Sequence, residues 1–70
     1  MVQVCSNMAG TIIEFLVKEG DKVSSGQDVV SLESMKMQLF VQAESDGTVA
    51  KVLKASGEFV NEGDPLLELS

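Results

Sequence analysis

Residues 10–33, GTIIEFLVKEGDKVSSGQDVVSLE, recur in the second half of the chain as residues 47–70, GTVAKVLKASGEFVNEGDPLLELS. Every glycine of the first stretch aligns with a glycine of the second, without a gap, at a constant offset of 37 positions. Extended back to the N-terminus, the alignment contains 33 pairs, of which eight are identical. Self-similarity of this kind indicates a duplicated structural unit.

The glycines of both copies lie in turn-forming surroundings, KEGDK, SSGQD and NEGDP, and these segments separate apolar stretches. Glycine accepts the positive φ that tight turns require, so these segments predict chain reversals. The apolar stretches between them are rich in the Val, Ile and Leu expected of strands. We therefore expect strands at residues 2–6, 10–17, 28–33, 38–43, 47–54 and 65–70, with short pairings around Val23 and Val60.

The duplication predicts two similar sheets that enclose one apolar interior and are related by a pseudo-two-fold axis, because neither copy could bury an apolar face alone. Hydrophobic residues make up 44% of the 70 residues, with three Phe and no Trp or Tyr, so the core must consist mainly of Val, Leu and Ile. A chain of this length has room for one small domain, residues 1–70, and little room for a deep catalytic cleft.

The charge of the chain limits its partners. Eleven Asp and Glu outweigh five Lys, which gives a formal net charge of −6. Such a chain repels the phosphates of nucleic acids and anionic membrane surfaces. Its first residues, MVQVCSNMAG, show no basic segment followed by a long apolar run, and no apolar run elsewhere approaches membrane-spanning length. We expect a soluble, cytoplasmic protein that binds neither nucleic acid nor membrane.

The side chains that usually carry catalysis are scarce. Histidine, Arg and Tyr are absent, and Cys5 is the only cysteine. Without these residues the common general bases, thiolate–imidazole pairs and zinc clusters cannot be assembled. We expect no catalytic residue and no metal site, and we expect Cys5 to be a partly buried small residue in a reducing compartment rather than a nucleophile.

The four residues SMKM, 34–37, join the two copies and belong to neither. A linker of four residues between two strands predicts a tight hairpin whose tip stands in solvent. Under the pseudo-two-fold axis the counterpart of this hairpin is the gap between the chain termini. Lys36 is therefore expected at the end of the molecule opposite both termini.

The hairpin has an unusual composition for a turn. Met35 and Met37 place flexible apolar side chains on both sides of Lys36, and the turn contains no Gly, Asn, Asp or Pro. A solvated turn residue is the simplest interpretation of a surface lysine, but exposed apolar neighbours often mark contact sites. An exposed amine in an otherwise inert domain is best suited to covalent attachment by an enzyme that removes its proton and supplies an activated acid.

The motif ESMKM, together with EGDKVSSGQDVVSLE before it and DGTVAKVLKASGEFVNEGDPLLEL after it, resembles the biotinyl domain of biotin-dependent carboxylases, the biotin carboxyl carrier family. The resemblance extends over essentially the whole chain. It implies an all-β fold, a flattened β-barrel sandwich of two four-stranded sheets known as a barrel-sandwich hybrid. The short path from Gly10 to Val23 leaves no room for the thumb loop of bacterial acetyl-CoA carboxylase carriers, so the chain is more similar to thumbless carboxylase domains or to a small stand-alone biotin/lipoyl attachment protein.

The resemblance also implies a function and its residues. Lys36 would carry covalent biotin, and Glu33, Ser34, Met35 and Met37 would be recognised by the biotin protein ligase. Ser34 departs from the Ala that is common at its position. The carrier would not be an enzyme itself. As a monomeric domain, it would shuttle carboxylate between biotin carboxylase and carboxyltransferase components.

Two alternatives are left open. A lipoyl domain shares the fold and modifies a hairpin lysine with lipoate, and modification by both biotin and lipoate is a further variant of this reading. Lipoyl hairpins more often place an acidic residue before the lysine and a small one after it, so Met35 and Met37 favour biotin. A protein-interaction module without cofactor belongs to a different class.

Overall fold

The computed structural model describes residues 2–70, so the expected alignment of Met1 with Gln38 lies outside the described residues. Within this range the chain forms eight β-strands and no helix. The strands are β1 (Val2–Cys5), β2 (Gly10–Phe15), β3 (Lys22–Val23), β4 (Asp28–Ser34), β5 (Met37–Gln42), β6 (Gly47–Val52), β7 (Phe59–Val60) and β8 (Pro65–Leu69). The expected strands are confirmed, with ends that differ by one or two residues.

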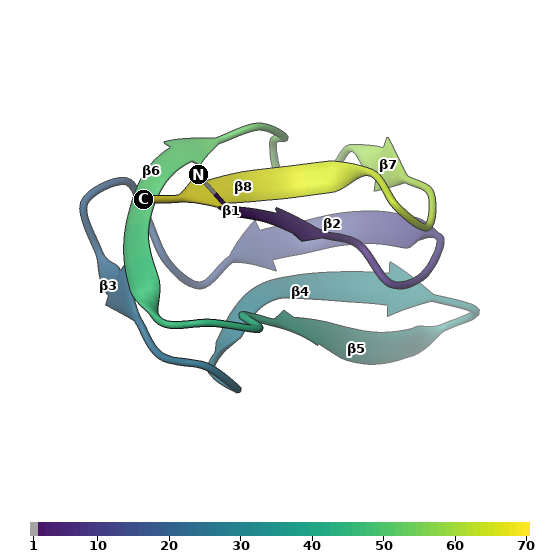
Figure 1. The fold of residues 1–70 in the computed structure, drawn as a ribbon. Helices are drawn as coiled ribbons and strands as arrows, with labels where there is room; N and C mark the ends of the chain where they lie inside the picture. Colours follow the sequence, from purple (N-terminus) through teal and green to yellow (C-terminus); the bar gives the residue numbers. More distant parts are fainter. Residues whose placement is uncertain (1) are drawn as a thin grey trace.

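The strands form two four-stranded antiparallel sheets (Figure 1). One has the order β1-β8-β6-β3, contains the first and last strands, and is called the terminal sheet below. The other has the order β5-β4-β2-β7, contains the β4–β5 hairpin, and is called the hairpin sheet. An offset of 37 residues places β1 on β5, β2 on β6, β3 on β7 and β4 on β8, so the order of one sheet becomes the order of the other. The predicted pseudo-two-fold relation is confirmed.

The two copies are interleaved rather than side by side. In the hairpin sheet, β2 and β4 of the first copy pair with β7 and β5 of the second. In the terminal sheet, β6 and β8 of the second copy pair with β3 and β1 of the first. Each copy therefore depends on the other for its backbone hydrogen bonds as well as for its core.

The symmetry extends to irregular features. The register shifts between Ile12 and Glu14 where β2 pairs with β4, and between Val49 and Lys51 where β6 pairs with β8. These two bulges are 37 residues apart. A bulge leaves one residue unpaired and increases strand twist, so the two sheets are bent at equivalent places.

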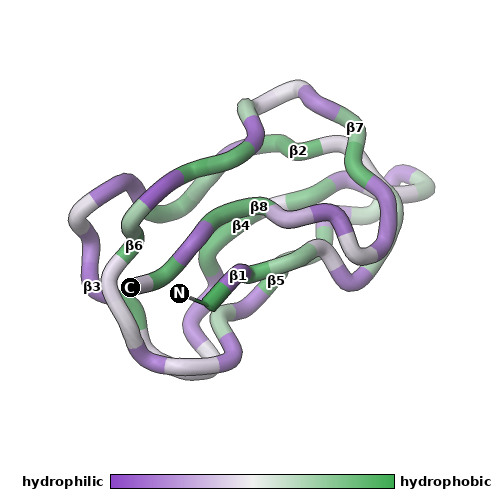
Figure 2. The backbone as a smooth tube through the Cα atoms, turned by 45° about the horizontal axis from the view of Figure 1, so that its top comes forward, coloured by the Kyte–Doolittle hydropathy of each residue, from purple (hydrophilic) through white to green (hydrophobic). Residues whose placement is uncertain are grey.

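The core lies between the sheets and is aliphatic, as expected. Its buried hydrophobic residues come from both copies: Val4, Ile12, Val17, Val23, Val29, Val30, Leu32, Val41, Ala43, Val49, Val60, Leu66, Leu67 and Leu69. In Figure 2, β2, β4 and β8 are hydrophobic over much of their length, whereas the connections between strands are largely hydrophilic. No helix in the described part of the chain is long and apolar enough to span a bilayer.

Candidate functional site

The β4–β5 hairpin closes with a turn of two residues, Met35 and Lys36. Its last pairs are Glu33 with Gln38 and Ser34 with Met37, so each strand extends one residue into the predicted four-residue linker. The hairpin is therefore tighter than expected. A tighter turn reduces the number of conformations open to Lys36 and fixes the direction in which it leaves the sheet.

The backbone of this turn is left-handed at two L-residues. The φ angle is 53° at Met35 and 64° at Lys36, and they are the non-glycine residues with positive φ in the described range. Two-residue hairpins favour this conformation because its twist matches that of the strands, but they usually place Asn and Gly in it. For other residues the left-handed region costs roughly 1–2 kcal/mol each. Such strain is common at functional sites, where side-chain identity is needed for another purpose.

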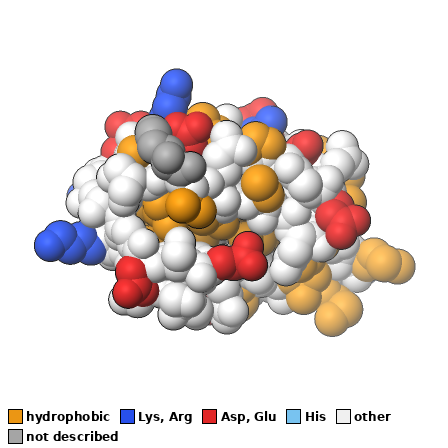
Figure 3. Space-filling model, in the orientation of Figure 1, with side chains coloured by type: hydrophobic (Ala, Val, Ile, Leu, Met, Phe, Trp, Pro, Cys, Tyr) orange, Lys and Arg blue, Asp and Glu red, His pale blue; other side chains and the backbone are white. Residues whose placement is uncertain are grey.

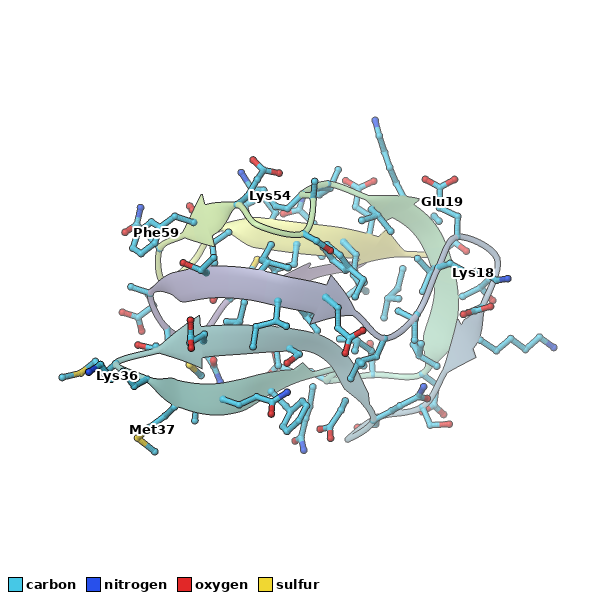
Figure 4. The ribbon with its side chains drawn as sticks, turned by 180° about the vertical axis from the view of Figure 1, so that it is seen from behind. Lys18, Glu19, Lys36, Met37, Lys54 and Phe59 are labelled. Atoms are coloured by element: carbon cyan, nitrogen blue, oxygen red, sulfur yellow. The ribbon has the colours of Figure 1, made fainter. Side chains whose placement is uncertain are left out.

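The turn presents its side chains to solvent. Met35 is 92% exposed and Met37 is 61% exposed, and Lys36 is exposed between them. Figure 1 shows the hairpin tip at the end of the molecule opposite the start of β1 and the end of β8. In Figure 3 hydrophobic side chains project from this end, and Figure 4 shows Lys36 pointing away from the sandwich. The expected position of Lys36, far from both termini, is confirmed.

The base of the hairpin is supported by Gly10, the first residue of β2. A Cβ atom on Gly10 would lie 2.8 Å from the backbone oxygen of Glu33, closer than any side chain allows without movement. Gly10 therefore lets β2 pass close to β4 just before the turn. Its role at the hairpin was not foreseen from the sequence, although its match to Gly47 across the repeat marked a backbone requirement.

The other predicted recognition residues lie beside the turn. Ser34 is half-buried at the end of β4, and Glu33 is exposed. Glu33 pairs with Thr11 on one side and Gln38 on the other, so its carboxylate shares a face of the hairpin sheet with them. The structure thus brings Glu33, Met35 and Met37 to the same end of the molecule as Lys36.

Cys5 requires a correction. The side chain is exposed, not partly buried as predicted. It lies on the edge strand β1 and lines a shallow hollow of about 260 Å³ with Phe40 and Glu44 of the second copy, among others. Its neighbours Val4 and Ser6 are both buried, whereas Cys5 is exposed and points outward. Among residues 2–70, no three His, Cys, Asp or Glu side chains form a group that could hold a metal.

The site fits a covalently attached group. Lys36 takes part in none of the side-chain hydrogen bonds found in the described part of the chain, all of which lie elsewhere. Acylation of its amine therefore breaks no contact of the fold. Because the turn projects from the end of the sandwich, an attached group has free space around it.

A family model described as "Biotin-requiring enzyme" matches residues 2–69. The chain belongs to the biotin/lipoyl attachment family. It is 51% identical over 67 residues to the biotin/lipoyl attachment protein of Bacillus subtilis (strain 168), covering 96% of this chain and 92% of that protein.

Longer members of the family match over part of their length. The biotin carboxyl carrier protein of Streptococcus mutans is 43% identical, and the match covers 90% of this chain and 48% of that protein. The crystal structure of the Kluyveromyces lactis urea carboxylase matches with a TM-score of 0.91 and 29% identity, over 99% of this chain and 6% of that one. The chain is thus similar in length to one relative, spans about half of a second and corresponds to a small part of a third. The barrel-sandwich fold predicted from the sequence is confirmed.

Proposed function

We propose that this chain is a biotin carboxyl carrier and that Lys36 is the residue to which biotin is attached. The observation that carries the proposal is the hairpin itself: a solvent-exposed lysine between two exposed methionines, on a strained two-residue turn. Membership of the biotin/lipoyl family supports it, as do relatives named biotin carboxyl carrier protein and propionyl-CoA carboxylase alpha chain.

Attachment requires an amide bond at the Lys36 amine. The ammonium group first loses a proton to the ligase or to solvent, since only the neutral amine is a nucleophile. The nitrogen then forms a bond to the acyl carbon of biotinyl-adenylate, the bond from that carbon to the phosphate oxygen breaks, and AMP leaves. A second proton leaves the nitrogen as the amide forms. This chain supplies only the accessible nitrogen; the biotin protein ligase supplies the catalytic groups.

After attachment, the role of the chain is to carry the biotinyl group and the carboxyl group bound to it. Biotin, when bound, supplies a ureido nitrogen that accepts and donates a carboxyl group. The rigid sandwich holds Lys36 on a fixed turn, and the flexible arm keeps the attached group at a high effective concentration near partner sites. We assign biotin carboxylase and carboxyltransferase components as these partners. The chain acts as a single monomeric domain, residues 1–70, in the cytoplasm, and it is a carrier rather than an enzyme.

The residues around Lys36 have recognition roles in this proposal. Met35 and Met37 offer the ligase two exposed apolar side chains, one on each side of the amine. Glu33 presents a carboxylate on the adjoining strand, and half-buried Ser34 lies at the start of the turn. None of the four reacts.

Lipoate is the second candidate for the attached group. One observation favours it: the Bacillus subtilis relative, similar in length to this chain, is named for both biotin and lipoyl attachment. The methionines on both sides of Lys36 favour biotin.

Mass spectrometry of protein from cells with active biotin and lipoate ligases tests the proposal. Intact mass and peptide mapping are compared for the wild type and Lys36→Ala. We expect a biotinyl increment on the Lys36 peptide of the wild type and none on the variant. A lipoyl increment would replace the carboxylase assignment with a lipoyl carrier, and an unmodified Lys36 would leave an interaction module.

A further inference from the structure

The pseudo-two-fold axis makes the outer faces of the two sheets directly comparable. On the hairpin sheet, one row of paired residues runs Gln38, Glu33, Thr11, Phe59, and the next runs Phe40, Ser31, Glu14. Directly paired residues of antiparallel strands share a face. An offset of 37 residues converts these rows into the corresponding rows of the terminal sheet. Apart from Gln38, whose counterpart lies outside the described residues, the residues of these rows therefore have geometric counterparts on the other sheet.

The side chains at these counterparts differ in kind. Phe59 corresponds to Lys22, Phe40 corresponds to Gln3, and Glu14 corresponds to Lys51. The backbone pairings are the same in each case: Thr11 with Phe59 matches Thr48 with Lys22. The fold therefore tolerates a polar side chain at each place where the hairpin sheet has an exposed aromatic one, and the aromatic residues are not required for folding.

The exposed aromatic residues belong to the same sheet as the lysine. Phe59 is 63% exposed and Phe40 is 44% exposed, and the bulged residue Ile13 is exposed as well. Figure 4, which views the molecule from the side of the hairpin sheet, shows Phe59, Lys36 and Met37 at one end. Only one strand, β2, lies between β7, which carries Phe59, and the β4–β5 hairpin. An enzyme that contacts this face would have the turn within reach.

The two sheets also differ in the charges of their strands. The strands of the hairpin sheet contain Glu14, Asp28 and Glu33 and no lysine, whereas those of the terminal sheet contain Lys22, Lys51 and Glu68. A partner for this face must therefore carry basic side chains around an apolar patch.

We propose that the outer face of the hairpin sheet, formed by Phe59, Phe40, Glu14 and Glu33, is a docking surface for the ligase that acylates Lys36, and that Phe59 is an apolar anchor in it. This inference rests on the proposed function. An unmodified lysine carries little information by itself, so a ligase must recognise the surrounding protein. Partners that act on the carried group can recognise that group. Exposed aromatic residues with a polar surround are typical anchors of protein interfaces.

The test exchanges residues between geometric counterparts. Phe59→Lys introduces the residue of position 22, and Lys22→Phe places the same aromatic side chain on the terminal sheet as a matched control. Glu14→Lys and Lys51→Glu form a second pair. Each variant is incubated with purified biotin protein ligase of the source organism, ATP and biotin. The kcat/KM for the biotinyl mass increment on Lys36 is measured, as is the Kd of the ligase for the unmodified protein by calorimetry. Thermal unfolding verifies that each variant is folded.

We expect Phe59→Lys to lower kcat/KM about tenfold and to raise Kd in proportion, and Lys22→Phe to stay within about twofold of the wild type. Glu14→Lys should weaken binding and make it less dependent on salt, and Lys51→Glu should change neither. Equal rates for the wild type and a folded Phe59→Lys would overturn the inference while leaving the carrier function intact. A wild type that the ligase does not biotinylate would instead remove the proposed function.

A reduced affinity of Phe59→Lys for the carboxylase, with an unchanged rate of biotinylation, would also overturn the assignment, because the face would then belong to a different partner. Equal losses in Phe59→Lys and Lys22→Phe would contradict it too, since a docking surface on one sheet cannot respond to the same exchange on the other.

Discussion

Two kinds of turn in this molecule use positive φ for different purposes. Four turns have glycine at φ between 87° and 93°: Gly20, Gly26, Gly57 and Gly63. The fifth, Met35–Lys36, has two L-residues at 53° and 64°. Glycine adopts these angles without steric cost, whereas L-residues do so under strain. The molecule thus avoids strain in four turns and accepts it in the turn that carries the lysine.

The glycine turns are also tied to the rest of the fold. The Gly20 amide donates to the Val49 carbonyl at 2.8 Å, and its counterpart Gly57 donates to Ile12 at 2.7 Å. A side chain of the same turn also braces the backbone: the carboxylate of Asp21, the residue after Gly20, accepts a hydrogen bond from the Lys18 amide at 3.0 Å. No side-chain hydrogen bond of this kind was found at the hairpin turn within residues 2–70. The glycine turns fasten the two copies together, and the lysine turn is left free for other molecules.

Removing the Lys36 amine should have the largest effect on modification and almost none on stability. Lys36→Ala is expected to abolish modification, whereas its free energy of unfolding should change by no more than about 0.5 kcal/mol because the side chain is exposed. Mass spectrometry and denaturant unfolding measure the two effects, with Lys18→Ala as the control lysine. Loss of cooperative unfolding in Lys36→Ala would show that this residue supports the fold.

Shortening the two methionines should separate recognition from stability. Met35 and Met37 are mostly exposed, so replacing both with Ala should lower the ligase kcat/KM by about tenfold, or 1.4 kcal/mol, with a much smaller change in stability. Biotinylation rates and thermal melts are compared on the same preparations. Equal losses in rate and stability would point to a packing role.

Adding a Cβ atom to a glycine turn should lower stability and leave biotinylation unchanged. A Cβ atom on residue 26 would have no other atom within 4 Å. Gly26→Ala should therefore lower the free energy of unfolding only through the strain of an L-residue at φ 87°, by about 1 kcal/mol or more. Urea unfolding measures it, and biotinylation at Lys36 should be unaffected. Ser24→Ala alters the same turn without a positive φ and serves as control. A neutral Gly26→Ala would contradict the role assigned to this glycine.

Relieving the strained turn should give the smallest effect. Met35→Gly places glycine at φ 53° and should stabilise the protein by about 0.5 kcal/mol, since the greater entropy of the unfolded chain offsets part of the relief. Thermal unfolding measures the change, and Met37→Gly, in a strand, should destabilise. A destabilised Met35→Gly would mean that the turn is not strained.

The position of the candidate site could be predicted from the sequence, but the conformation of its turn could not. The unmatched residues 34–37 indicated an exposed hairpin because they are the only break in the repeat. Their composition gave no turn type, and the sequence predicted a linker of four residues where the structure has a turn of two. The exposure of Cys5 was missed because its small side chain was taken to be partly buried, although its polar counterpart Gln42 is exposed as well.

The sequence by itself determined the duplication, the six long strands, the aliphatic core and the position of Lys36 between the copies, because the repeat, the glycine turns and the apolar stretches between them can all be recognised along the chain. Only the tertiary structure decided that the copies interleave, that Gly10 supports the hairpin, and that Phe59 shares a sheet with Lys36. These depend on which strand edges pair, and pairing between residues as distant as Gly10 and Val60 is set by closure of the whole sandwich.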